Sequence, residues 1–423
     1  MNQAPPSPDR PATARIAGDL GAALVAAGLC YGLSCVIVAP ASLDPALPTF
    51  ATQWQSMSEA PFELRGQFPH RFLGPLLAHY LGFGGDRWVP FVRGLAVLLL
   101  ATVFFFARRR GARPVDALLV TLALAVTAPI QIYKQHWVGY VDPLCYLLFF
   151  WAWLAAGRPA LFWSLFLANL LAHELAAFLL PWAWFVRREA NGCMRADVIG
   201  AGLALGLYGA FYLWVKAAAP QQKFNAGYFF DNPMFPGGTF VILALAITHL
   251  VVAFGPILAV LAWHQHTRRD RERAHLWLVG GGIIAIFCIA WDWSRHSNLI
   301  ALPLVLASLR FLAAGHRLVY AGIVGLGAGL MAWIPPWSSS AWPTSAMADI
   351  LLLRDTGAAR QNPATGGEPM GGALSDVLTK WVPAVAPVLV PILAILAAIW
   401  FAGAWFARRQ PPAMAARASA SAP

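Results

Sequence analysis

Residues 42–87 read SLDPALPTFATQWQSMSEAPFELRGQFPHRFLGPLLAHYLGFGGDR and lie between two long apolar runs. Aromatic residues, Pro and Gly alternate in this segment with ionisable residues: Asp44, Glu59, Glu63, Arg65, His70, Arg71, His79, Asp86 and Arg87. This mixture is typical of a folded loop beside a membrane rather than of a flexible tether. We therefore expect the first outer loop of a polytopic membrane protein at 41–87.

The whole chain has the composition of an integral membrane protein. Its 423 residues are 59% hydrophobic and 12% charged, and the mean hydropathy is +0.60. A soluble domain of this composition would expose large apolar patches. The net charge of +11 includes short basic runs beside apolar segments, such as Arg108–Arg110 and Arg408-Arg409. These runs indicate topology determinants and contacts with anionic lipid. Aromatic-stacking nucleic-acid motifs are absent, which argues against a nucleic-acid-binding class.

Apolar runs divide the chain into candidate membrane helices, at 16–38, 88–107, 115–132, 141–156, 159–186, 198–215, 239–263, 276–291, 298–314, 318–334 and 382–406. If the run 159–186 crossed the membrane once, Arg187 and Arg188 would lie on the outer side, against the positive-inside rule. A break near His173-Glu174 removes this conflict. It gives two short helices that enter the membrane and return, with the break facing a polar cavity.

The predicted fold class is therefore an all-α, polytopic transmembrane helix bundle of about 10–12 membrane helices, counting the broken pair as two. The bundle forms a single domain at 16–406, with outer loops at 41–87, 216–238 and 335–381. The segments 1–15 and 407–423 are expected to be disordered cytoplasmic tails. Basic runs place both termini in the cytoplasm and the protein in a bacterial inner (plasma) membrane.

Ionisable side chains gather at the outer ends of several predicted helices, whereas the inner side carries mainly Arg runs. The candidate phosphate-binding and substrate-binding residues are Arg65, His70, Arg71, Lys134, His136, Asp142, His173, Glu174, Asp292, Arg295 and His296. An ionisable group inside a membrane span costs about 2.5–3.5 kcal/mol on insertion scales unless it is paired or hydrated. Their collection on one side therefore predicts an outward-facing polar cavity.

Two arginines have contexts that suit a phosphate. Arg71 opens a helix-like stretch, where the guanidinium and the helix N-terminus both favour an anion. Anchoring of a lipid headgroup is the alternative for Arg71. Asp292, Arg295 and His296 have i, i+3 and i+4 spacing and share one face of a helix. The alternative for this triplet is an interfacial ion pair flanked by Trp anchors.

Two other candidates also have structural alternatives. His173 and Glu174 lie in the middle of an apolar run, where a functional role competes with simple packing between helices. Asp142 precedes Pro143 at the start of an apolar span, which is also the pattern of an ordinary helix N-cap.

Carboxylates of the first outer loop are the candidate catalytic groups. Glu59 and Glu63 are like charges at i and i+4, so a cationic ligand, a metal ion or Arg65 is expected near them. Either glutamate, or Asp44, is a candidate general base for a transfer reaction. A divalent cation, Mg²⁺ or Mn²⁺, is a candidate cofactor. The spacing of His136, His173, Glu174 and His296 does not require one, and the chain has no HExxH motif.

The large first outer loop, the charged residues at the outer face, the broken helix pair and the late Gly/Pro-rich outer loop together resemble GT-C-type membrane glycosyltransferases. The resemblance is architectural and covers roughly residues 16–310. It implies a sugar donor carried on polyprenyl phosphate at the outer (periplasmic) face, an acidic first-loop residue as base or metal ligand, and basic residues that hold the donor phosphate. This chain departs from many members because it has no Asp-Asp, Asp-Glu or Glu-Glu dipeptide.

The expected function is that of an enzyme, a glycosyltransferase that moves a sugar from the lipid-phosphate donor to a glycan, lipid or protein acceptor. Its expected partners are membrane lipids, the donor and the acceptor. The alternative is a multi-span transporter or lipid flippase, which predicts related halves and charges at the membrane midplane. No such halves occur, and most charges fall at outer ends. A third possibility is a non-catalytic membrane scaffold. In that case the burial of His173 and Glu174 within an apolar run would have to be explained by structure alone.

Overall fold

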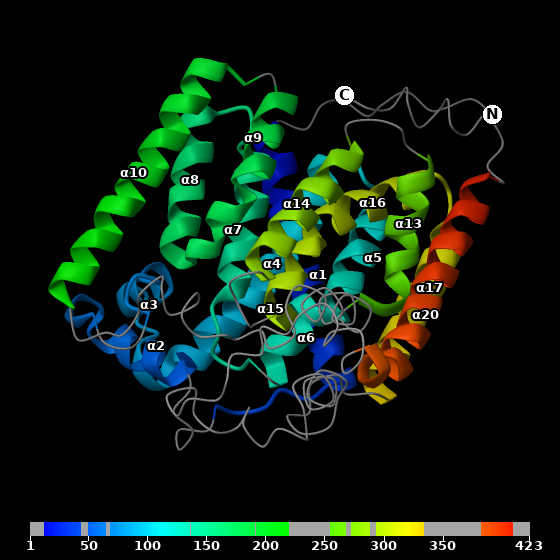
Figure 1. Ribbon diagram of the computed structural model, residues 1–423, viewed down its shortest axis with the longest axis horizontal. Coiled ribbons are helices and arrows are strands. Elements are labelled where there is room, and N and C mark those ends of the chain that lie inside the picture. Colours follow the sequence, from blue (N-terminus) through cyan, green and yellow to red (C-terminus); the bar gives the residue numbers. More distant parts are fainter. Residues whose placement is uncertain are drawn as a thin grey trace.

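The computed structural model describes residues 12–43, 50–64, 68–135, 137–190, 192–219, 254–267, 272–287, 293–333 and 382–408. The described residues form helices and no strand, which confirms the predicted all-α class. Most of the longer helices run between two ends of a bundle, and α2 and α3 lie at one end (Figure 1).

The helical elements follow the apolar runs of the sequence, because those runs bury their side chains against one another. The longest helices are α1 (Ala12–Ile37), α4 (Trp88–Arg109), α10 (Met194–Ala218) and α20 (Val382–Arg408). Intermediate helices are α5 (Pro114–Ala125), α7 (Asp142–Leu154), α8 (Pro159–Ala172), α9 (Leu180–Glu189), α13 (Leu258–Thr267), α14 (Glu272–Phe287), α16 (Ala301–Ala313) and α17 (Arg317–Trp333). Short elements are α2 (Phe50–Glu59), η1 (Pro61–Glu63), α3 (Leu73–Tyr80), η2 (Gly85–Arg87), α6 (Ala128–Gln135), η3 (Glu174–Leu179), η4 (Gly255–Ile257), α15 (Trp293–His296) and η5 (Ser297–Ile300).

Several bounds differ from the predicted ones. The first helix begins at Ala12, inside the segment expected to be a disordered tail, and α20 continues to Arg408. The helix α10 extends to Ala218, into the expected outer loop at 216–238. The expected outer loop at 335–381 lies outside the described residues.

Three segments of the described chain are long and apolar enough to cross a membrane: Gly18–Ile37, Gly85–Arg109 and Met194–Ala218. A fourth results if Pro114–Ala125 and Ala128–Lys134, bent by 45°, count as one span. This is fewer than the roughly 10–12 membrane helices that the apolar runs predict. One reason is that runs such as 141–156 fold into helices of 10–17 residues, too short to cross a hydrocarbon core of about 30 Å at 1.5 Å per residue.

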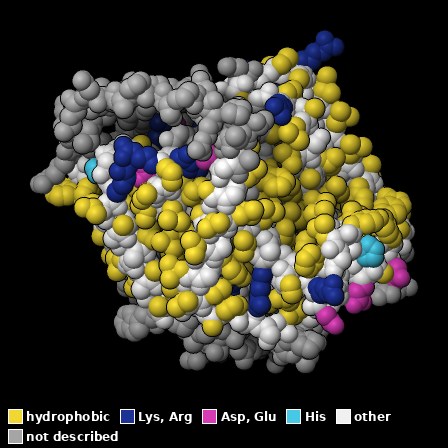
Figure 2. All heavy atoms as spheres, turned by 180° about the vertical axis from the view of Figure 1, so that it is seen from behind, with side chains coloured by type: hydrophobic (Ala, Val, Ile, Leu, Met, Phe, Trp, Pro, Cys, Tyr) yellow, Lys and Arg dark blue, Asp and Glu magenta, His cyan; other side chains and the backbone are white. Residues whose placement is uncertain are grey.

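The outer helices present apolar faces to the surroundings. On α1, Leu24 and Leu29 are 57% and 67% exposed, and on α10, Leu207 and Leu213 are 56% and 65% exposed. Figure 2 shows hydrophobic side chains across the middle of one face, with charged side chains gathered towards its upper and lower edges. Apolar surfaces of this extent are expected where lipid, rather than water, covers the protein.

The helix break predicted near His173-Glu174 is present. The helix α8 ends at Ala172, and His173 is extended, with φ −161° and ψ 120°, before η3 and α9 begin. In α9, Arg187 donates a hydrogen bond to the carbonyl oxygen of Ala156, just before α8. The start of α8 and the end of α9 therefore lie together, so that the chain enters the bundle and returns to the same end.

At one end of the bundle, several arginines form ion pairs that connect neighbouring helices. We call the end that contains Arg108, Arg187, Arg310 and Arg317 the arginine end, and the opposite end, with α2, η1 and α3, the loop end. Each of these four arginines is paired with a carboxylate, on Asp19, Asp197, Glu272 and Asp116 respectively. These pairs connect helices at the arginine end.

Candidate functional site

The first-loop cap, which we define as residues 50–64 and 68–80, is tied together and to η2, just before α4, by contacts of Ser58. Ser58 Oγ accepts a hydrogen bond from the Gly85 N–H at 3.0 Å, and the Ser58 carbonyl oxygen lies 3.1 Å from His79 Nδ1. Gly85 has φ +62°, a conformation that glycine adopts without strain. The described part of the loop is therefore a folded element that can position side chains against the bundle.

Arg71 projects from this cap onto the helix break. Its Nε and Nη2 atoms donate hydrogen bonds to Glu174 Oε2 and Oε1 at 2.9 and 2.6 Å. The guanidinium carbon lies 4.3 Å from the centre of the Phe68 ring. His70 Nε2 is 3.3 Å from Glu174 Oε2. A bidentate, charge-assisted pair thus joins the first-loop cap to η3.

A second buried ion pair lies deeper in the bundle, between Arg295 of α15 and Asp142 at the start of α7. Arg295 Nη2 donates to the two carboxylate oxygens at 2.8 and 2.9 Å. The Arg295 side chain is fully buried, and its guanidinium carbon lies 4.4 Å from the centre of the Tyr140 ring and 5.4 Å from that of Trp137. Such aromatic contacts stabilise a cation that is removed from water.

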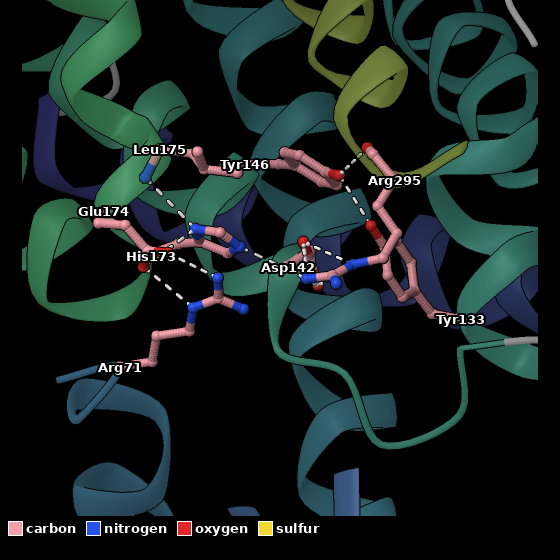
Figure 3. Close-up of polar contacts among 8 residues, drawn as sticks. All are labelled: Arg71, Tyr133, Asp142, Tyr146, His173, Glu174, Leu175 and Arg295. Carbon is pink, nitrogen blue, oxygen red and sulfur yellow. Dashed lines mark hydrogen bonds and ion pairs between the residues drawn. The ribbon is translucent and has the colours of Figure 1, made fainter. Parts of the chain in front are cut away.

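His173 lies between the two ion pairs. Its Nδ1 atom is 3.5 Å from Glu174 Oε2, and its Nε2 atom is 3.4 Å from Arg295 Nη2. Figure 3 shows the imidazole placed between Arg71 on one side and Asp142 with Arg295 on the other. We call this set the charged cluster; its members are His70, Arg71, Asp142, His173, Glu174, Arg295 and His296. Its two guanidinium groups and two carboxylates balance in formal charge, which is a condition for burying them.

The cluster does not suit the candidate Mg²⁺ or Mn²⁺ ion. Ligand atoms of Asp142, His173 and His296 lie within 4.8 Å of one another, beside a cavity of about 20 Å³. Both oxygens of Asp142 already accept hydrogen bonds from Arg295, and hard cations prefer several oxygen ligands to imidazole nitrogens. The cavity has room for about one water molecule.

The structure brings together the candidates His70, Arg71, Asp142, His173, Glu174, Arg295 and His296. It places Lys134 elsewhere, because the Lys134 ammonium donates to Ser34 Oγ at 3.1 Å and to the Val38 carbonyl oxygen at 3.0 Å, at the C-terminal end of α1. Glu59 and Glu63 have exposed side chains on α2 and η1, whereas the cluster is largely buried. Asp44, Arg65, His136 and Asp292 lie outside the described residues.

Three polar residues that support the cluster were not predicted. The Tyr146 hydroxyl donates to the Arg295 carbonyl oxygen at 2.8 Å and lies 2.8 Å from the Tyr133 hydroxyl (Figure 3). Asn169 donates to the Cys145 carbonyl oxygen at 3.0 Å and so joins α8 to α7. A signal was present: Tyr146 follows Asp142 by four residues on α7, so that the two share a helix face, and Asn169 lies four residues before His173, which caps the end of α8.

No protein-family model, curated protein or solved structure matches this chain. The chemistry of the charged cluster is therefore the basis for a functional proposal. It offers two guanidinium groups that can bind oxyanions, and two carboxylates and imidazoles that can exchange protons. One of its ion pairs, Arg71 with Glu174, joins the first-loop cap to the helix break.

Proposed function

We propose that the protein is a polytopic membrane glycosyltransferase that takes a sugar from a lipid-phosphate carrier at the outer face of the membrane, at the loop end of the bundle. The observation that carries this proposal is the Arg71–Glu174 pair, formed between the first-loop cap and a helix break. A broken helix in a membrane is tolerated where it lines a polar cavity or is buried in protein. We also propose, as part of the same function, that the protein has about 10–12 membrane helices and an architecture like that of GT-C-type glycosyltransferases.

Arg71 is the residue that a donor phosphate would reach first. The side chains of Arg71 and its partner Glu174 are 6% and 21% exposed, whereas that of Arg295 is 0% exposed. A phosphate oxygen pair matches the guanidinium as well as a carboxylate does, so that the donor can take the place of Glu174 on Arg71. In this proposal Arg295, which is held by Asp142, lies deeper in the bundle and adds positive electrostatic potential at the donor phosphate.

The acceptor hydroxyl requires a base, and the first outer loop supplies the candidates Asp44, Glu59 and Glu63. The side chains of Glu59 and Glu63 are exposed at the loop end, where an acceptor from the outer side would arrive. A positioned carboxylate contributes about 10²–10⁴-fold to a transfer reaction as general base. In this proposal, His173 and Asp142 hold the other members of the charged cluster in place on the side of the donor that faces the interior of the bundle.

The test compares wild type with Arg71→Ala, using native mass spectrometry and lipid analysis of protein extracted gently from its host membrane. We expect a polyprenyl phosphate, or its sugar conjugate, to copurify with wild type and to be lost from Arg71→Ala. The matched control is Arg87→Ala, which removes an exposed arginine from the same end of the molecule. If Arg71→Ala and Glu63→Ala both retain full transfer activity, the assignment is wrong.

A lipid flippase or transporter is the second candidate. Half-helices that meet at a break also form the substrate sites of many transporters, and a charge-balanced cluster can exchange partners during a conformational change. If only bulk phospholipid copurifies with wild type and with Arg71→Ala, this second candidate is favoured. A flux assay in liposomes, with the same pair of variants, then decides whether Arg71 is needed for transport.

A further inference from the structure

A groove with a volume of 860 Å³ runs along the surface between α1 and α8, over α4 and α7. Its walls are apolar and open to the surroundings: Leu20 and Leu24 of α1 are 49% and 57% exposed, and Leu161 of α8 is 46% exposed. In its floor, Trp151 Nε1 donates to Thr102 Oγ1 at 2.9 Å, so that the indole N–H is satisfied without a ligand. The volume lies in the range of about 300–1,000 Å³ that is typical of ligand sites.

Two arginines line the groove at the arginine end of the bundle: Arg109, the last residue of α4, and Arg158, directly before α8. Both side chains are exposed, and neither has an ion-pair partner within the described part of the chain. The arginines on either side of Arg109 are engaged, since Arg108 pairs with Asp19 and the Arg110 guanidinium lies 5.0 Å from the centre of the Phe106 ring. Arg109 and Arg158 therefore offer positive charge to an anion at this position.

The length of the groove matches one leaflet of a bilayer. Along α4 the groove extends from Leu98 to Arg109, which corresponds to about 16 Å at 1.5 Å per residue. The hydrocarbon core of a bilayer is about 30 Å thick, so that the groove covers roughly half of it. An acyl chain in one leaflet would lie against the apolar walls while its headgroup reached the two arginines.

We propose that the groove binds one anionic phospholipid of the leaflet at the arginine end, with the lipid phosphate at Arg109 and Arg158 and an acyl chain between α1 and α8. The N-terminal segment of the chain itself fits the groove poorly. Residues 1–11 read MNQAPPSPDRP, in which Met1 is the only large apolar side chain. This site does not depend on glycosyl transfer, because it lies at the opposite end of the bundle from the charged cluster.

The test measures lipid retention by native mass spectrometry on the full-length protein in detergent, titrated with phosphatidylglycerol or with phosphatidylcholine of the same acyl chains. We expect wild type to retain one phosphatidylglycerol in preference to phosphatidylcholine. The variant Arg109→Gln/Arg158→Gln should lower the affinity for phosphatidylglycerol on the order of tenfold. The control Arg113→Gln/Arg188→Gln removes the same charge from exposed positions outside the groove and should retain the lipid as wild type does.

A second variant tests the acyl part of the site without altering charge. Gly157 lines the groove, and a Cβ atom added there meets no atom within 4 Å, so that the backbone accepts a side chain at this position and Gly157→Leu adds apolar volume to the groove. We expect Gly157→Leu to weaken phosphatidylglycerol retention and to keep the wild-type unfolding temperature in lipid-free detergent. Equal retention by wild type and both groove variants would overturn the proposal. A rise in phosphatidylglycerol binding after deletion of residues 2–11 would also overturn it, because that result would identify the N-terminal segment as the occupant of the groove.

Discussion

At the scale of single residues, Arg71 and Glu174 compensate each other's charge in a site with little access to water. The Arg71 side chain is 6% exposed, and its two hydrogen bonds to Glu174 span 103 residues of sequence. Removing one partner of a buried pair leaves the other charge without compensation, whereas replacing both with apolar side chains removes the charge altogether. The two kinds of change should therefore differ in their effect on stability.

Glu174→Leu is predicted to lower the free energy of unfolding by about 3–5 kcal/mol, because it leaves the Arg71 guanidinium buried and unpaired. The double variant Arg71→Met/Glu174→Leu should recover most of that loss. Equilibrium unfolding of the purified protein in detergent micelles measures both values. Asp86→Leu, at an exposed carboxylate of the same end, is the control and should change stability by less than about 0.5 kcal/mol. If Glu174→Leu is as stable as this control, the buried Arg71 guanidinium does not need Glu174 to compensate its charge.

At the scale of helices, α8 and α10 approach closely where α10 has a glycine. A Cβ atom added to Gly200 would lie 2.2 Å from Trp163 Cδ1 and 2.9 Å from Trp163 Nε1. The Trp163 ring cannot easily turn away, because its Nε1 atom donates to Asp197 Oδ1 at 3.0 Å. Asp197 in turn accepts from Arg187, so that the contact is linked to the end of the broken helix pair.

Gly200→Ala is therefore predicted to destabilise the protein by about 1–3 kcal/mol, since the methyl group forces the two helices apart. Gly202→Ala on the same helix is the matched control. A Cβ atom at Gly202 meets nothing within 4 Å, and alanine favours a helix over glycine by about 0.5–1 kcal/mol. The unfolding midpoints of the two variants in detergent should thus shift in opposite directions. A loss of similar size in both would contradict the close packing of α8 on α10.

At the scale of the whole molecule, the two ends of the bundle predict its orientation in the membrane. Cys193 is exposed at the start of α10, close to the arginine end, and Glu63 is exposed on η1 at the loop end. Because basic residues favour the cytoplasmic side, we expect the arginine end inside and the loop end outside. In intact cells, a thiol reagent that cannot cross the membrane should label Glu63→Cys in a Cys193→Ser background. It should label Cys193 of the otherwise unchanged protein only after permeabilisation.

Labelling of Cys193 in intact cells, together with protection of a cysteine at position 63, would show the opposite orientation. The charged cluster would then face the cytoplasm, and a donor on the outer leaflet would not reach Arg71. Cys193→Ser without a second substitution is the control for labelling at the remaining cysteines, of which Cys30 and Cys145 are buried and Cys35 is partly buried.

Several features could be predicted from local sequence properties. Apolar runs predicted helices because a chain without water must satisfy its backbone hydrogen bonds within each segment. The position of Arg187 and Arg188 after a long apolar run predicted the break at His173-Glu174, and α8 does end at Ala172. Charge among apolar residues also marked Arg71, Asp142 and Arg295 as candidates, since such groups need compensation.

The pairing of those charges was decided only by the tertiary structure. Asp142 reads as a helix N-cap, yet it holds Arg295 from a position 153 residues away, and Lys134, a candidate for phosphate binding, bonds to the end of α1. The lengths of the shorter helices were also seen only in the structure. Composition and hydropathy are properties of a segment by itself, whereas the partner of a buried charge depends on which helices pack together. That choice is made by the shapes and charges of all the contacting faces at once, and no single stretch of sequence contains it.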